Sequence, residues 1–238
     1  MPTDPERRVA IVTGGSRGIG AGIVAGYRDL GWSVVATART IAPSDDPDLV
    51  TIAGDISSPP TAARILDEAL ARFGHVDTLV NNAGAFVAKP FTEYTAQDYA
   101  TVVGANLQGF FALTQLAVAH LLGRGRGHIV NMTSTLAEYA DSSSPAVLGA
   151  LTKGGLASAT RALAIECAAS GVRVNAVSPG VIQTPEHPPE GYVGPAAATP
   201  LGRVGQVDDI VRAILFLEAS PFVTGEIVHV DGGRSAGH

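Results

Sequence analysis

The sequence predicts an α/β protein built on a doubly wound parallel sheet of about seven strands, with helices on both faces. Three observations predict this class. Short β-branched segments alternate with longer helical patterns, the predicted strands are almost continuously apolar, and a glycine-rich turn joins the first strand to the first helix. Strands that are apolar throughout are typical of sheets covered by helices on both sides.

The predicted elements follow one another in strict alternation. The strands are expected at residues 9–13, 33–38, 50–54, 78–82, 128–132, 172–177 and 227–230. The helices are expected near residues 18–30, 60–73, 96–122, 146–169 and 207–217. Strands that alternate with helices form βαβ units with right-handed crossovers, so the sheet should be parallel.

Two irregular stretches interrupt this pattern. Residues 40–48 stand where a helix could follow the second strand, and they favour a loop on the ligand side of the sheet. Residues 184–200 form a long segment rich in proline and glycine. Loops of this length in compact domains are often functional, so we expect a lid over a substrate pocket. A plain surface connection is the alternative.

Composition and charge narrow the class of protein. The chain has 238 residues, a formal net charge of −6 and one cysteine, Cys167. The acidic balance argues against nucleic-acid binding, and one cysteine allows neither an internal disulfide nor a cysteine-rich zinc site. The sequence shows neither a signal-peptide core nor an apolar run of membrane-spanning length. We therefore expect one cytoplasmic domain, residues 1–238, with no metal, nucleic-acid or membrane partner.

The glycine-rich turn is the clearest binding motif. Gly14, Gly18 and Gly20 lie between the first predicted strand and the first predicted helix. Glycine allows a tight turn and a close approach of the backbone to a phosphate, and the helix N-terminus offers free N–H groups to it. In this context the pattern predicts a Rossmann-type dinucleotide site, rather than an ordinary β–α turn.

Further motifs extend this pattern through nearly the whole chain. The turn reads Thr-Gly-x-x-x-Gly-x-Gly, and "NNAG" at 81–84, "GDI" at 54–56, Asn106 in "GANLQG" and "IVNMTS" at 129–134 follow. "RVNAVSPGVIQT" at 173–184 and "TGEIVHVDGG" at 224–233 complete the series. With these motifs the sequence resembles the short-chain dehydrogenase/reductase family.

The resemblance implies a nicotinamide cofactor. The positions that would contact it are Gly14, Ser16, Arg17, Gly18, Ile19, Gly20, Arg39, Asp55, Ile56, Asn82, Ala83, Gly84, Lys153, Pro179, Gly180, Ile182 and Thr184. Ala38 occupies the position where an acid would bind the adenosine ribose, and Arg17 and Arg39 could pair with a 2′-phosphate. This favours NADP(H) over NAD(H). The alternatives are that both arginines are solvated surface charges and that Asp55 is only a turn residue.

Only some of the family's catalytic residues are present at the matching positions of this sequence. Asn106, Ser134 and Lys153 match the asparagine, serine and lysine of the family. The resemblance implies that a tyrosine four residues before the lysine should exchange a proton with the substrate oxygen. That position is Gly149, which carries no proton donor.

Several groups could replace the missing phenol. Tyr139 follows Ser134 in the same loop, and His187 lies in the expected lid. An unperturbed histidine pKa near 6.5 suits proton transfer. Tyr192 is a weaker candidate, and water reached through Ser134 and Lys153 is another. Surface packing is the alternative for each aromatic side chain.

The sequence therefore favours an NADP(H)-dependent oxidoreductase acting on a small carbonyl, alcohol or activated double bond, with an altered proton donor. The alternative is a cofactor-binding protein without standard redox turnover, acting as a sensor or partner subunit. A non-redox lyase or isomerase stays open without a residue that selects it. The resemblance also implies a homotetramer or homodimer, formed through the predicted helices 96–122 and 146–169.

Overall fold

The computed structural model describes residues 7–140, 144–185 and 199–237, and it confirms the predicted fold class. Seven parallel strands form one sheet in the order β3-β2-β1-β4-β5-β6-β9. The strands are β1 (Val9–Thr13), β2 (Ser33–Ala38), β3 (Leu49–Ala53), β4 (Thr78–Asn81), β5 (Gly127–Met132), β6 (Val172–Pro179) and β9 (Ile227–Val230). Their positions agree with the predicted ones to within two residues at each end.

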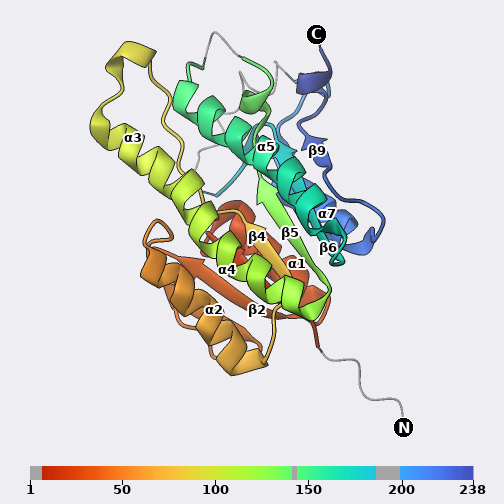
Figure 1. Ribbon diagram of the computed structural model, residues 1–238. Helices are drawn as coiled ribbons and strands as arrows, with labels where there is room; N and C mark the ends of the chain where they lie inside the picture. The colour runs from red at the N-terminus through yellow and green to blue at the C-terminus, as the bar shows by residue number, and fades with distance from the viewer. Residues whose placement is uncertain (1–6, 141–143, 186–198, 238) are drawn as a thin grey trace.

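Helices cover both faces of this sheet (Figure 1). They are α1 (Gly18–Asp29), α2 (Pro59–Phe73), α3 (Ala96–Val103), α4 (Gly109–Arg124), α5 (Val147–Ala168) and α7 (Val207–Ala219). One core layer joins α2, α4 and α5 to the sheet, and the other joins α1 and α7 to it. Alternate residues of β1 serve the two layers, since Ile11 lies in the first and Ala10 and Val12 lie in the second. This is the doubly wound arrangement.

Local sequence explains where several helices begin and end. α2 begins with two prolines after Ser58, and it ends at Gly74, whose φ of 80° is the left-handed conformation that glycine adopts easily. α3 begins with a capping box, in which the side chains of Thr95 and Asp98 bond each other's backbone N–H.

The predicted helix 96–122 is not one regular helix. A π-helical turn, η2 (Gly104–Gln108), separates α3 from α4. The continuous helical segment Ala96–Arg124 has 29 residues. By its length and composition alone it could cross a membrane. Leu113, Ala117 and Leu121 are fully buried against the sheet, as in a core helix of a folded domain.

The late irregular region contains a short pairing that the sequence did not indicate. β7 (Ile182–Gln183) and β8 (Gly205–Gln206) form a two-stranded parallel sheet, and the side chain of Gln206 donates to that of Gln183. Most of the expected lid, together with His187 and Tyr192, lies outside the described residues.

A buried carboxylate joins several elements at the end of the sheet where the strands begin. One oxygen of Glu218, Oε2, lies 3.0 Å from each of Tyr27 Oη, Thr78 Oγ1 and His128 Nδ1. Asn175 Nδ2 lies 3.1 Å from the other ring nitrogen of His128. Nε2 therefore accepts a hydrogen bond while Nδ1 donates one, which describes a neutral imidazole.

Replacing Glu218 with alanine should lower the free energy of unfolding by about 3–5 kcal/mol, because three buried donors lose their acceptor. Denaturant unfolding measures this change, and the exposed Glu68→Ala is the control. A loss no larger than that of the control would contradict the assignment.

The same network predicts acid sensitivity. Burial lowers the pKa of His128. The unfolded chain therefore binds a proton below about pH 6.5 that the folded chain resists. Burial raises the pKa of Glu218, but hydrogen bonds from His128, Tyr27 and Thr78 outweigh it and leave that pKa lowered. Both shifts make the free energy of unfolding fall as the pH falls. Denaturant unfolding at a series of pH values between neutral and acid pH would measure this decrease.

Candidate functional site

A large cavity opens at the carboxyl ends of four neighbouring strands, β1, β2, β3 and β4. It has a volume of about 1190 Å³. Its lining comes from the segments that follow these strands and from α3 and η2. The sheet order reverses between β1 and β4, and ligands of doubly wound sheets bind at this switch point.

Most of the predicted cofactor residues line this cavity. They are Gly14, Ser16, Arg17, Gly18, Ile19, Gly20, Arg39, Asp55, Ile56, Asn82, Ala83, Gly84 and Thr184. Thr40, Ile41 and Ala42 also line it, so the start of the irregular stretch 40–48 lies on the ligand side, as expected. Among the described residues, Lys153, Pro179, Gly180 and Ile182 are not part of this lining.

The glycine turn is closely packed. A Cβ on Gly20 would lie 1.9 Å from the carbonyl oxygen of Gly14, so no larger residue fits there without moving the turn. Gly14 has a φ of 69°, and a Cβ on it would lie 2.9 Å from Asn82 Nδ2. These glycines bring the backbone close to the cavity at the N-terminus of α1, where free N–H groups can bind a phosphate.

The end of β4 is bonded to the same turn. Thr13 Oγ1 accepts hydrogen bonds from the backbone N–H groups of Asn82 and Ala83, at 3.0 and 2.9 Å. Asn82 Nδ2 donates to the carbonyl oxygens of Thr13 and Gly14. The "NNAG" segment therefore fixes the position of the glycine turn and contributes to the wall of the cavity.

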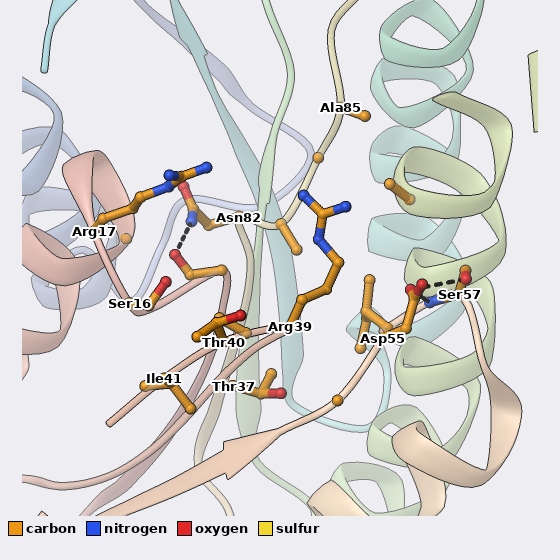
Figure 2. Close-up of a pocket in the computed structure, with 18 of the residues that line it drawn as sticks. Ser16, Arg17, Thr37, Arg39, Thr40, Ile41, Asp55, Ser57, Asn82 and Ala85 are labelled. Carbon is orange, nitrogen blue, oxygen red and sulfur yellow. Dashed lines mark hydrogen bonds between the residues drawn. The ribbon is translucent and has the colours of Figure 1, made fainter. Parts of the chain in front are cut away.

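Charged side chains of both signs line one part of the cavity. Figure 2 shows Arg17 and Arg39 extending from two separate loops, with Asp55 and Ser57 beyond Arg39. Asp55 Oδ1 accepts from the backbone N–H and the hydroxyl of Ser57, at 2.9 and 2.8 Å. These bonds, with a smaller contribution from Arg39, lower the pKa of Asp55. Asp55 is thus a turn-forming carboxylate that also faces the cavity.

Asn106 lies in the π-helical turn and is almost fully buried. Its Oδ1 accepts from the backbone N–H of Ala85 at 2.8 Å, and its Nδ2 donates to the Ala85 carbonyl at 3.1 Å. Nδ2 also donates to Thr152 Oγ1 at 2.9 Å. The side chain therefore joins the segment after β4 to α5, and π turns of this kind are frequent at functional sites.

Lys153 and Ser134 lie near the end of β5. Lys153 Nζ donates to the carbonyl of Met132 at 2.6 Å, and burial lowers the pKa of this lysine to about 8. Ser134 Oγ accepts from the backbone N–H of Leu136 at 3.3 Å. A Cβ on Gly84 would lie 3.0 Å from Asn106 Oδ1 and 3.4 Å from Lys153 Nζ. The structure thus brings Asn106 and Lys153 together beside the cavity wall.

Gly149 lies in the first turn of α5. Apart from the adjacent residues and the backbone of the helix itself, the three atoms nearest to a Cβ built on it are Cδ2 and Cε2 of Phe86, both at 3.4 Å, and Cβ of Ala146, at 3.8 Å. No polar atom is among these three. Sequence reasoning missed Phe86, and its position two residues after "NNAG", in a segment that lines the cavity, was the signal that could have found it.

Tyr139 is half-buried, and its ring contacts the C-terminal part of the chain. The Arg234 guanidinium carbon lies 5.8 Å from the Tyr139 ring centroid, a cation–π distance. The neighbouring Glu138 Oε2 lies 2.9 Å from His229 Nε2. Tyr139 contributes none of the three atoms named above as nearest to a Cβ at position 149.

Within residues 7–140, 144–185 and 199–237, no group of three or more His, Cys, Asp or Glu side chains is placed to hold a metal ion. The charged and amide side chains that line the cavity include Arg17, Arg39, Asp55 and Asn82, beside the backbone of the glycine turn. This set suits a dinucleotide.

The fold defines a Rossmann-type α/β protein with a cavity at the switch point of its sheet. Residues 14–235 match the sequence profile of a family described as enoyl-(acyl carrier protein) reductase. The chain belongs to the short-chain dehydrogenase/reductase family, as the sequence motifs implied.

Individual relatives cover nearly the whole chain. L-fucose dehydrogenase from Mus musculus is 36% identical, over 97% of this chain and 89% of its own length. The structure of 3-ketoacyl-(acyl-carrier-protein) reductase from Brucella melitensis, complexed with NADH, has a TM-score of 0.89 and 31% identity, over 97% of this chain and 99% of that one. Gluconate 5-dehydrogenase from Burkholderia cenocepacia, in complex with NADP and tartrate, has a TM-score of 0.87 and 28% identity, over 97% and 96%.

Proposed function

We propose that the protein is an NADP(H)-dependent oxidoreductase that acts on a small carbonyl, alcohol or activated double bond, with a proton-transfer arrangement that lacks the usual tyrosine. One observation carries the proposal: the cavity at the switch point of the sheet joins a phosphate-binding glycine turn to Arg17 and Arg39, with Lys153 and Asn106 beside its far wall. The relatives named as reductases and dehydrogenases support the reaction class.

The preference for NADP(H) rests on charge. Ala38 supplies no carboxylate to the adenosine ribose, whereas Arg17 and Arg39 both line the cavity. Guanidinium groups bind phosphate through paired, charge-assisted hydrogen bonds. Structural relatives bind either cofactor, since one is complexed with NADP and another with NADH, so the arginines are the argument specific to this chain.

The bound nicotinamide would supply or accept the hydride. In this proposal the Lys153 ammonium holds the nicotinamide ribose, and the Ser134 hydroxyl binds the substrate oxygen. Asn106 fixes the backbone of Ala85 and the hydroxyl of Thr152, so it positions the wall beside the nicotinamide. Pro179, Gly180 and Ile182 would complete the nicotinamide end of the site from the segment after β6.

The proton would reach the substrate oxygen from solvent, by way of Ser134 and Lys153. The lowered pKa of Lys153, about 8, lets this lysine gain and lose a proton near neutral pH. Tyr139 and His187 stay alternative donors. Tyr139 would have to leave Arg234 to reach the substrate, and His187 lies outside the described residues.

A second candidate function is a nicotinamide-binding protein without standard redox turnover. One specific observation favours it: outside the helix backbone and the adjacent residues, the atoms nearest to a Cβ at position 149 belong to Phe86 and Ala146, so hydrocarbon lies beside the position where the resemblance implies a phenol. Both functions need the cofactor site, and they differ only in turnover.

Calorimetric titration with NADPH and with NADH, followed by assays on ketones, enones and alcohols, separates the candidates. Tighter NADPH binding with turnover of at least one substrate class is the expected result. NADPH binding without turnover across the panel would support the second function. Failure to bind either nicotinamide would contradict both.

Lys153 predicts a pH dependence of cofactor binding. Its ammonium is the form that donates to a ribose hydroxyl, and burial lowers its pKa to about 8. Above that pH the free protein must take up a proton to bind, so NADPH affinity should be steady near pH 7 and fall by up to about tenfold per pH unit above 8. Calorimetry across this range measures it.

Lys153→Arg is the matched variant, because arginine keeps its charge throughout. It should flatten the pH profile even if its affinity at neutral pH is lower. An unchanged slope in Lys153→Arg would show that another group titrates.

We also propose that the protein self-associates through α4 and α5. Phe111 on α4 and Leu151 and Ile165 on α5 are 62%, 58% and 80% exposed, although they are large and apolar. Exposed apolar faces of this kind often mark interaction sites. Light scattering should give a dimer or tetramer, and Ile165→Asp should shift the mass towards the monomer. A monomeric wild-type protein would contradict the proposal.

A further inference from the structure

Phe86 stands between the cavity and α5. Two carbons of its ring lie 3.4 Å from the position that a Cβ on Gly149 would occupy. At this distance a Cβ would touch the ring, so the ring lies beside the space that a larger side chain at position 149 would enter. The remaining surface of Phe86 lines the cavity, and the residue is 56% exposed.

The backbone around Phe86 is held on both sides. Ala85 is bonded in both directions to the buried Asn106. Tyr94 Oη donates to the Val87 carbonyl at 2.8 Å, and the backbone N–H of Lys89 donates to the Pro145 carbonyl at 2.9 Å. The last of these bonds joins the segment to the residues just before α5, so the fold places Phe86 next to Gly149.

An exposed aromatic face on a cavity wall favours a planar, apolar ligand. Covering the ring with a ligand removes apolar surface from water, and a second aromatic group gains further from stacking or edge-to-face contact. Gly84 and Ala85, the neighbouring lining residues, add little bulk beside the ring. The polar groups that recognise phosphate and ribose lie on other parts of the lining.

We propose that Phe86, backed by Gly149, is a specificity-determining residue that selects substrates with a planar aromatic or conjugated group next to the reacting carbon. The inference rests on the proposed function, because it needs the substrate to lie beside the nicotinamide. It deepens that function by naming the substrate class. Phe86 takes no part in proton transfer, and its role is to position the substrate.

The test compares two ketones of equal carbon number, acetophenone and cyclohexyl methyl ketone, on the protein saturated with NADP⁺. The oxidised cofactor cannot reduce a ketone, so calorimetry measures binding without turnover. The wild-type protein should bind acetophenone more tightly. Phe86→Leu keeps an apolar side chain but removes the ring, so it should weaken acetophenone binding by about 3- to 10-fold. Binding of the saturated ketone should change by less than about twofold.

Phe91→Leu is the matched control. Phe91 is 68% exposed in the 3₁₀ turn Phe91–Glu93 that follows Phe86 in the chain, packs on Tyr94, and does not line the cavity. It should leave both affinities unchanged. Equal wild-type affinity for the two ketones, equal losses in Phe86→Leu and Phe91→Leu, or no saturable acetophenone binding would each overturn the inference.

These outcomes stay separate from the proposed function. If NADP⁺ binds and acetophenone binding depends on Phe86 but no turnover is found, Phe86 still selects the class of ligand while the oxidoreductase function fails. If turnover is found but Phe86→Leu does not change acetophenone binding, the oxidoreductase function stands and the proposed substrate class is wrong. If NADP⁺ does not bind, the proposed function and the inference that rests on it both fail.

Discussion

Gly149→Tyr combined with Phe86→Ala should raise the rate of ketone reduction about 10²–10⁴-fold above the wild-type rate, the range that a positioned proton donor supplies. Gly149→Tyr alone should gain much less. Lys153 lies one turn further along α5, so a phenol at position 149 would share its helix face. Single-turnover reduction by bound NADPH measures the gain.

The need for the second substitution comes from the geometry around Gly149. A Cβ at this position already contacts the Phe86 ring at 3.4 Å, so a whole phenol ring must displace it. Alanine at position 86 provides the space. The segment that carries it keeps its backbone bonds to Asn106 and Pro145, so the wall should stay in place.

Gly149→Phe combined with Phe86→Ala is the matched control, because it adds the same ring without the hydroxyl. It should show none of the gain. Equal rates for the Tyr and Phe versions would show that filling space, and not proton transfer, changed the rate. Equal gains for Gly149→Tyr with and without Phe86→Ala would contradict the assigned place of the Phe86 ring.

Arg17→Ala with Arg39→Ala should weaken NADPH binding by about 100-fold and change NADH binding by less than about threefold. Hydrogen bonds to charged groups contribute about 1.5–3 kcal/mol each, and only NADPH carries the 2′-phosphate. The two arginines come from different loops that line one cavity (Figure 2). Removing both therefore removes the positive charge from this part of the lining. Calorimetry with each cofactor measures the two affinities.

The control for the arginine pair is Arg72→Ala. Arg72 is an exposed arginine near the end of α2 that bonds the Pro47 carbonyl and does not line the cavity. It should leave both affinities unchanged. A similar loss for NADPH and NADH in the double variant would mean that the arginines bind phosphates common to both, and the preference for NADP(H) would be wrong.

Much of the fold could be predicted because local signals agreed with one another. The apolar strands, the glycine turn after β1 and the prolines that begin α2 each act over a few residues. The π turn around Asn106 could not be predicted this way. It is held by bonds to Ala85 and Thr152, which lie far from it in the sequence. Position in the fold decides such a feature more than helix propensity does.

In the candidate site, too, some features follow from the local sequence and others depend on tertiary contacts. The family resemblance, applied four residues before Lys153, identified Gly149 as the position where a tyrosine is implied and a glycine stands. What surrounds Gly149 depends on a tertiary contact, since the bond from Lys89 to Pro145 brings the Phe86 segment alongside α5. Tyr139 was considered as a proton donor because it follows Ser134, yet its ring packs under Arg234, a residue close to the other end of the chain. Only the folded arrangement could reveal either contact.

The most direct test of an NADP(H)-dependent oxidoreductase at this site is to follow the transferred hydride itself. The protein would be incubated with NADPH deuterated on the transferable face of nicotinamide C4 and with aromatic ketones and enones, and the products examined by mass spectrometry. The account predicts a product that carries one deuterium, formed in equal amount with NADP⁺. Tightly bound NADPH that transfers no deuterium to any of these substrates would contradict it.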